Sequence, residues 1–253
     1  MIKFIALIAA AFFLTLLSAA DMMIISDSTA VDYRGKKNPY NHNKVGWAPM
    51  SGWGEFAADA AGKQLKVLNR SAGGFSSKTY CEKQLRSTQK HFQKGAWLLL
   101  SFGSNDARYS AADPGRSTTA DGTFMEYMNK IASEAKAAGM KVVIISPLPF
   151  YSMADGKFSN TVLQPYAQAS EKLAMANNYA YVDLFGMMSK YFSNMSDEEI
   201  RTHYMFLAPN ASSNWPHGRK DPLHLTDKGA RKAWEFILEG LKKEAPELAA
   251  LFK

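Results

Sequence analysis

The chain has 253 residues, 47% of them hydrophobic, so it can bury one sizeable core, and a single domain is the natural expectation. Its formal net charge of +7 favours an acidic partner, which for an exported protein could be a polyanionic polysaccharide or an anionic surface. The sequence has no long Lys/Arg run and no basic stripe interleaved with aromatic residues, which argues against a nucleic-acid partner.

The N-terminus predicts a secretory signal peptide. Lys3 gives a small positive start, a long apolar run follows, and the small residues Ala19 and Ala20 offer two cleavage positions. An uncleaved membrane anchor is the alternative, but strand-type sequence follows at once without a linker. We therefore expect a signal peptide over 1–20, one folded domain over 21–253, a secreted or periplasmic location, and no stable membrane insertion after signal removal.

Beyond this segment, short apolar runs rich in Val, Ile and Leu alternate with helical patterns, as expected for strands buried on both faces. The strand-like runs are 22–26, 65–71, 96–103, 141–147 and 180–184. The helical patterns cover 78–93, 123–138, 162–177 and 227–243, the second beginning with a capping box formed by Thr123 and Glu126. This alternation predicts right-handed βαβ units and a parallel sheet between two layers of helices.

Cys81 is the only cysteine, so an intrachain disulfide is impossible and the core alone must stabilise the fold. We expect a small buried residue on a helix, with a nucleophilic thiol as the alternative.

Polar or glycine-rich clusters follow the first three strand-like runs. Ser28 comes two residues after the first run, Gly73 and Gly74 follow the second, and Asn105 and Asp106 follow the third. Ligands of parallel α/β sheets bind beyond the carboxyl ends of the strands, so these clusters should share one rim. A separate turn or capping role for each is the competing interpretation.

A nucleophilic serine needs a base. His224 precedes the last helical pattern and has Asp221 three residues upstream, a spacing that in a turn lets the carboxylate reach one ring nitrogen. Taken alone this pair is weak, because a capping or core histidine would explain it equally well.

Four sequence blocks taken together, in their order along the chain, are more specific than the Asp221–His224 pair alone. Ser28 in Asp-Ser-Thr, Gly74 in a glycine turn, Asn105 in Gly-x-Asn-Asp, and Asp221-x-x-His224 resemble the SGNH, or GDSL-type, hydrolases, whose Ser, Gly, Asn and His blocks occur in this order. The stretches SDSTAVDY, GWGEF and NRSAGGFSSKTY are similar, more narrowly, to rhamnogalacturonan acetylesterases of carbohydrate esterase family twelve. The similarity runs from residue 22 to about residue 240.

This resemblance implies a three-layer α/β/α sandwich with a five-stranded, flavodoxin-like parallel sheet. It also implies Ser28 as nucleophile, His224 as base and Asp221 as the residue that orients it. The backbone N–H groups of Ser28 and Gly74 and the amide of Asn105 would form the oxyanion hole, and no cofactor or metal is implied. Asp27 is interpreted as holding the serine turn by hydrogen bonds rather than as a triad member.

Three residues depart from the family pattern. Ser26 replaces a glycine, which matters little if the backbone there is extended. Ser104 stands where histidine is common and Phe75 where arginine is common; both are expected on the rim, where they bear on recognition of an acidic sugar.

Trp53, Trp215 and His217 are candidate substrate-binding residues, since an aromatic ring beside the triad could stack on a sugar. A packing role for the tryptophans and a surface position for His217 are equally compatible with the sequence. A metal site built from His203, His217, Asp221 and His224 is conceivable, but their spacings match no compact ligand motif.

The sequence therefore predicts an exported, metal-independent serine esterase that removes O-acetyl groups from a polysaccharide, with a pectic polymer as one candidate. The alternatives are a lipase or lysophospholipase on the same scaffold, and a non-catalytic carbohydrate-binding protein that retains the fold.

Overall fold

The computed structural model describes residues 22–34, 50–61, 65–108, 114–213 and 215–252. The expected signal peptide lies outside the described residues, and so do most residues between Tyr33 and Met50. Among the described helices, none has the length and apolar character needed to cross a membrane.

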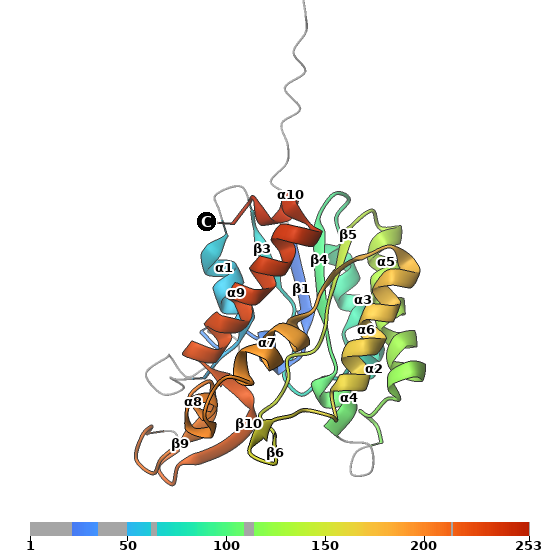
Figure 1. The fold of residues 1–253 in the computed structure, drawn as a ribbon. Coiled ribbons are helices and arrows are strands. Elements are labelled where there is room, and N and C mark those ends of the chain that lie inside the picture. Colours follow the sequence, from blue (N-terminus) through green and yellow to red (C-terminus); the bar gives the residue numbers. More distant parts are fainter. Residues whose placement is uncertain (1–21, 35–49, 62–64, 109–113, 214, 253) are drawn as a thin grey trace, which may run out of the picture.

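A five-stranded parallel sheet forms the centre of the molecule (Figure 1). Its strands lie in the order β3-β1-β4-β5-β8. Their bounds are β1 Met22–Ser26, β3 Val67–Asn69, β4 Trp97–Ser101, β5 Lys141–Ile145 and β8 Ala180–Val182. All five predicted strands are confirmed, and the flavodoxin-like order is confirmed with them.

Helices cover both faces of this sheet, which confirms the predicted three layers. One layer contains α1 (Trp53–Ala60), α7 (Leu184–Phe192), α9 (Asp227–Glu244) and α10 (Pro246–Ala249). The other contains α2 (Ser77–Lys83), α3 (Leu85–Thr88), α5 (Met125–Ala137) and α6 (Gln164–Asn177). Because successive side chains of a strand face opposite sides, Met22 and Ile24 pack in the first core while Met23 and Ile25 pack in the second.

A second, antiparallel sheet was not predicted. It consists of β2 (Met50–Ser51), β10 (Arg219–Thr226) and β9 (Tyr204–Leu207), with β10 in the middle. The expectation that Asp221 and His224 lie in a turn is therefore wrong, since both are on β10. The pairing of β10 with β9 shifts register between Asp221 and Leu225, and this irregularity, which spans Pro222, hides the strand in the sequence.

Two helix predictions need correction. Thr123 does not begin the helix; Thr119 caps an irregular turn over Ala120–Phe124, its Oγ1 accepting from the Thr123 N–H at 3.3 Å, and α5 continues from Met125. The pattern over 78–93 is divided into α2, α3 and a short turn at Gln89–His91, with Gln84 at the break between the two helices. The remaining described elements are the hairpin of β6 (Met153–Ala154) and β7 (Lys157–Phe158), with α4 (Ser104–Arg108) and α8 (Asp197–Arg201).

Cys81 is buried on α2, as predicted. Burial raises the pKa of its thiol to about 12, so the side chain stays protonated and is a poor nucleophile at neutral pH.

Asp106 on α4 ties together the segments that follow β3 and β4, the two strands on either side of β1. Its buried carboxylate accepts hydrogen bonds from the Ser77 N–H at 3.1 Å, the Ser77 hydroxyl at 2.5 Å and the Thr118 hydroxyl at 3.0 Å. Burial raises the pKa of Asp106 to about 6 and the nearby charge of Asp27 acts in the same direction, while the hydrogen bonds oppose the rise.

This raised pKa predicts a pH-dependent contribution to stability. The folded state holds the Asp106 proton more tightly than the unfolded state, so the stabilisation is complete below pH 4 and is lost as pH rises through about 6. Between pH 4 and pH values above 6, this group should lower the free energy of unfolding of wild type by about 3 kcal/mol. In Asp106→Asn this fall should be absent. Urea denaturation at pH 4, 5, 6 and 7 measures it, with exposed Asp155→Asn as the control for losing one carboxylate. Parallel stability curves for wild type and Asp106→Asn would contradict the assignment.

Candidate active site

Ser28 opens a short 3₁₀ turn, Ser28–Ala30, directly after the central strand β1. Asp27 caps this turn: its Oδ1 accepts from the N–H of Thr29 at 2.9 Å and from the Thr29 hydroxyl at 2.7 Å. The hydroxyl of Tyr33 donates to the Ser28 carbonyl at 3.0 Å and fixes the turn from its other side. The turn-holding role predicted for Asp27 is confirmed. Ser26 is the last residue of β1, so its backbone is extended, and a serine fits there in place of a glycine.

Ser104 lies beneath the rim and not on it, which corrects the prediction. The residue is almost completely buried, and its hydroxyl hydrogen-bonds to Asp27. Burial raises the pKa of Asp27, and the bonds from Thr29 and Ser104 and the nearby His224 counteract the rise. Ser104 thus helps to satisfy a carboxylate under the serine turn.

The glycine turn after β3 approaches Ser28 closely. A Cβ placed on Gly73 would lie 4.0 Å from the Cβ of Ser28. Gly74 has φ +78°, a left-handed conformation that favours glycine over residues with a Cβ. The sequence singled out this pair correctly as a turn at the same edge as Ser28.

Asn105 lies at the start of α4 and is nearly fully buried. Its Nδ2 donates one hydrogen bond, 2.9 Å long, to the carbonyl of Phe75. A side-chain amide carries two N–H groups, so this bond holds the amide in place and leaves its second N–H without a partner among the residues that the structure describes. Phe75 itself is half-buried beside this contact.

Asp221 and His224 form a close pair on β10. The Nδ1 of His224 lies 2.8 Å from Oδ2 of Asp221, and the backbone N–H of His224 donates to Oδ1 at 3.0 Å. Arg219 reaches the same Oδ2 through Nε at 3.1 Å and also through Nη2. The predicted pairing of Asp221 with His224 is therefore present, carried by a bulged strand.

The charge state of Asp221 follows from these partners. Burial alone would raise its pKa, but the hydrogen bonds and charges of His224 and Arg219 outweigh burial and hold the pKa of Asp221 well below its usual range. The carboxylate therefore stays ionised at any pH where an esterase works. Arg219 is in turn packed over the ring of Trp215, with its guanidinium carbon 4.8 Å from the ring centroid.

The strand that carries the pair lies beside the serine turn, since β10 and the turn over Ser28–Ala30 contact each other. Tyr33 occupies the junction. Burial raises the pKa of its hydroxyl far above the usual value, and the charges of Asp27 and Asp221 add to the effect, so Tyr33 remains a neutral donor to Ser28. Sequence reasoning missed Tyr33, because nothing in the sequence shows that its ring lies between two distant segments.

The three candidate substrate-binding residues have different surroundings. Trp53 is 0% exposed, so it anchors α1 in the core and cannot form a wall of the site, which corrects that interpretation. Trp215 is half-buried against the apolar cluster that contains Tyr33 and Met205. His217 is exposed in the connection between β9 and β10, and its role in substrate binding stays a prediction.

In the part of the chain that the structure describes, no three His, Cys, Asp or Glu side chains gather as metal ligands would. His203, one of the histidines considered for such a site, is fully buried between the rings of Tyr191 and Phe192. Its Nδ1 lies 3.0 Å from the carbonyl of Glu199, and burial lowers its pKa. His203 therefore belongs to the core.

Comparison with known proteins adds an independent observation. The model of the GDSL-like Lipase/Acylhydrolase family matches residues 27–232, which include Ser28, Gly74, Asn105, Asp221 and His224. The chain is 25% identical over 197 residues to the rhamnogalacturonan acetylesterase RhgT of Bacillus subtilis, covering 78% of this chain and 82% of that protein. It is 26% identical over 226 residues to the "Probable rhamnogalacturonan acetylesterase YesY" of the same organism, covering 89% and 94%.

Solved structures share the fold. A Bacillus subtilis protein from structural genomics superposes with a TM-score of 0.67 at 22% identity, covering 88% of this chain and 56% of that chain. Axe2, an acetylxylan esterase from Geobacillus stearothermophilus, superposes with a TM-score of 0.61 at 13% identity, covering 88% of this chain and 94% of that chain. With a serine turn, a glycine turn, a buried asparagine and an aspartate–histidine pair at one edge of this sheet, the chain belongs to the GDSL-like lipase/acylhydrolase family and is a carboxylic ester hydrolase.

Proposed function

We propose that this hydrolase removes O-acetyl groups from an acetylated polysaccharide, using Ser28 as nucleophile, His224 as base and Asp221 as the orienting carboxylate. The observation that carries the proposal is the Asp221–His224 pair on β10, the strand that contacts the turn beginning with Ser28. The relatives named as rhamnogalacturonan acetylesterases support a pectic polymer of the rhamnogalacturonan type as the substrate. An exported location fits both this substrate and the N-terminal sequence.

The proposed reaction begins when Nε2 of His224 takes the hydroxyl proton of Ser28 and the serine oxygen attacks the acetyl carbonyl. The resulting oxyanion accepts hydrogen bonds from the backbone N–H groups of Ser28 and Gly74 and from the Asn105 amide. His224 then returns the proton to the leaving sugar oxygen. Water, activated by the same histidine, hydrolyses the acetyl-serine and releases acetate.

Asp221 and Arg219 act behind the histidine. The carboxylate accepts the Nδ1 proton of His224, which directs the opposite nitrogen toward Ser28 and stabilises the imidazolium that forms during attack. Arg219 holds Asp221 ionised and in position from the other side. Tyr33 keeps the Ser28 carbonyl, and with it the serine turn, fixed during the reaction.

The proposal is tested by measuring acetate release from acetylated pectins, xylans and mannans. We expect release from at least one polymer and its loss in Ser28→Ala. The small side chain of Ser28 opens the serine turn and belongs to neither hydrophobic core, so the melting temperature of the variant should stay close to wild type. A preference for long-chain over acetyl p-nitrophenyl esters would indicate a lipase-type acylhydrolase instead. Polymer binding without release would indicate a non-catalytic protein, and hydrolysis by folded Ser28→Ala would remove the nucleophile assignment.

Asn105→Ala separates an oxyanion donor from a structural amide. The structure gives Asn105 a bond to the Phe75 carbonyl, so its loss should lower the free energy of unfolding by about 1 kcal/mol. A donor to the oxyanion should in addition cost roughly 10²- to 10³-fold in kcat, with KM for a small acetyl ester nearly constant. Steady-state kinetics and thermal melting of this variant give both numbers. A stability loss with unchanged kcat would exclude Asn105 from the oxyanion hole.

Asp221→Asn tests the orienting carboxylate. An amide can keep the size of the side chain but not its charge, and it leaves Arg219 without its anionic partner. We expect kcat/KM at neutral pH to fall by roughly 10⁴-fold while the fold persists. The matched experiment is treatment of wild type with a chelator, which should have no effect. Full activity in Asp221→Asn together with inhibition by the chelator would replace the serine mechanism by a metal mechanism.

A further inference from the structure

Asn69, the last residue of β3, joins the serine turn to the segment that leads into the glycine turn. Its Nδ2 donates to the carbonyl of Ala30, the last residue of the serine turn, at 2.6 Å. Its Oδ1 accepts from the N–H of Ser71 at 3.0 Å, two residues further along the chain. One half-buried side chain therefore holds the backbone of two segments that come from different strands.

The bond to Ser71 is an Asx turn, which asparagine often forms where a strand ends, and such a turn needs only the side-chain oxygen. The bond to Ala30 serves no local turn, since 39 residues separate its partners. The start of α1 lies directly against it. A Cβ placed on Gly54 would lie 2.2 Å from the Ala30 oxygen and 2.4 Å from Nδ2 of Asn69. The packing of α1 thus fixes the position of this bond.

The two joined segments carry the two backbone donors assigned to the oxyanion. Ser28 opens the serine turn that Ala30 closes, and Gly74 follows Ser71 by three residues. Among the residues that the structure describes, the N–H groups of Ser28 and Gly74 have no acceptor. Because most backbone N–H groups of a folded protein are paired, two unpaired ones on neighbouring turns are available to a ligand oxygen. To bind one oxygen together, they must be held at a fixed separation.

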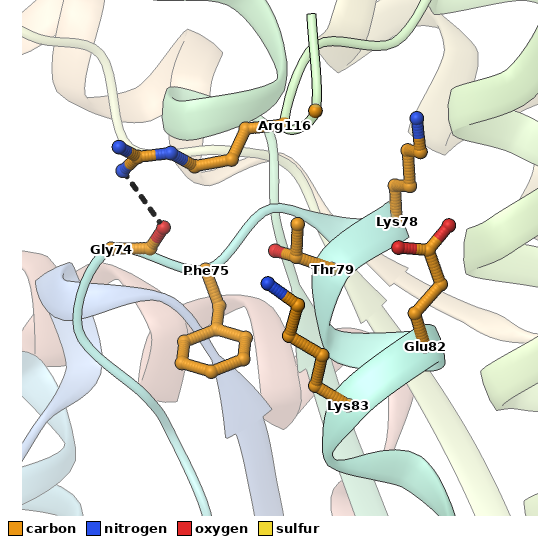
Figure 2. A pocket seen from close by; sticks show the side chains of 8 residues that line it. Gly74, Phe75, Lys78, Thr79, Glu82, Lys83 and Arg116 are labelled. Atoms are coloured by element: carbon orange, nitrogen blue, oxygen red, sulfur yellow. Dashed lines mark hydrogen bonds between the residues drawn. The ribbon is translucent and has the colours of Figure 1, made fainter. Parts of the chain in front are cut away.

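The far end of the glycine turn is held by other residues. The carbonyl of Phe75 accepts from Asn105 at 2.9 Å, and the carbonyl of Gly74 accepts from Arg116 at 3.2 Å, the bond drawn as a dashed line in Figure 2. Neither bond reaches the serine turn. The separation of the two turns therefore depends on the link through Asn69.

We propose that Asn69 is a positioning residue for the oxyanion hole, because its amide fixes the N–H of Ser28 relative to the N–H of Gly74. Without this bridge each turn stays attached to its own strand, but the two N–H groups no longer converge on one oxygen. The inference rests on the proposed reaction and adds to it a residue that acts only through the backbone of the two donors.

The test compares Asn69→Ala with Asn69→Asp, using p-nitrophenyl acetate as the ester. At neutral pH an ionised aspartate keeps the acceptor for the Ser71 N–H, but it cannot donate to the Ala30 carbonyl. We expect kcat to fall roughly 10- to 100-fold in both variants with KM nearly constant, because misplaced donors act on charge that develops in the transition state. Wild-type kcat in Asn69→Asp would reduce Asn69 to an ordinary turn residue and overturn the proposal.

Asn160→Ala is the matched control. Asn160 donates to the Phe150 carbonyl at 2.7 Å and accepts from the Leu163 N–H at 3.1 Å, so it bridges two backbone segments as Asn69 does, but outside both turns. Asn160→Ala and Asn69→Ala should each lower the melting temperature by a few degrees, whereas only the Asn69 variant should lose kcat. An equal loss of kcat in the control would assign the effect to stability and overturn the proposal.

Asn105→Ala separates this inference from the proposed mechanism. A large fall in kcat for Asn105→Ala, with wild-type kcat in both Asn69 variants, would overturn the positioning role and leave the oxyanion hole in place. Wild-type kcat in Asn105→Ala and in both Asn69 variants would remove the oxyanion hole and the positioning role together.

Discussion

The parallel register of β1 between β3 and β4 is the constraint on which the site depends. Ile24 lies opposite Asn69 and Ser26 lies opposite Ser101, so the three strands end at one edge. The pairing continues beyond β3, because the N–H of Ala72 donates to the Ser26 carbonyl at 3.0 Å and draws the glycine turn alongside the serine turn. A shift of one residue would turn every side chain of β1 to the opposite face, and two cores fill both faces.

This constraint explains which parts of the molecule the sequence could predict. A strand buried on both faces must be apolar throughout, so β1 and β4 can be recognised in the sequence as continuous apolar runs. Because the two strands are parallel, the residues that follow them lie at the same edge of the sheet. Ser28, Gly74 and Asn105 were identified because each follows such a run. The pairing of Asp221 with His224 was also predictable, because three residues separate them and their contact is local.

The remaining features depend on contacts between distant segments. β10 contains Pro222 and a register shift, and its partners β2 and β9 are short, so no local pattern marks the second sheet. Trp53 could be a core residue or a site wall until its burial was known, and Ser104 was placed on the rim because its bond to Asp27 cannot be read from the sequence. Arg219 likewise gains its importance only from its distance to Asp221.

The pKa values of three buried or half-buried aspartates near this edge could not be predicted from the sequence either. The pKa of Asp221 is lowered because Arg219 and His224 outweigh burial. The pKa values of Asp27 and Asp106 are raised because burial outweighs their neutral hydroxyl and N–H donors. The residue type is the same in all three cases, but Asp221 is less completely buried than the other two and is held between two cationic partners.

The two parts of the proposed triad lie on segments that are far apart in the sequence. Ser28 follows β1, whereas Asp221 and His224 are on β10. Contacts between such distant segments carry a large loop-closure entropy and are favoured only after local structure has formed. With the roles proposed for Ser28 and His224, the serine and its base meet only once the parallel sheet and the second sheet have both formed, so the appearance of esterase activity during refolding would report the last contacts to form.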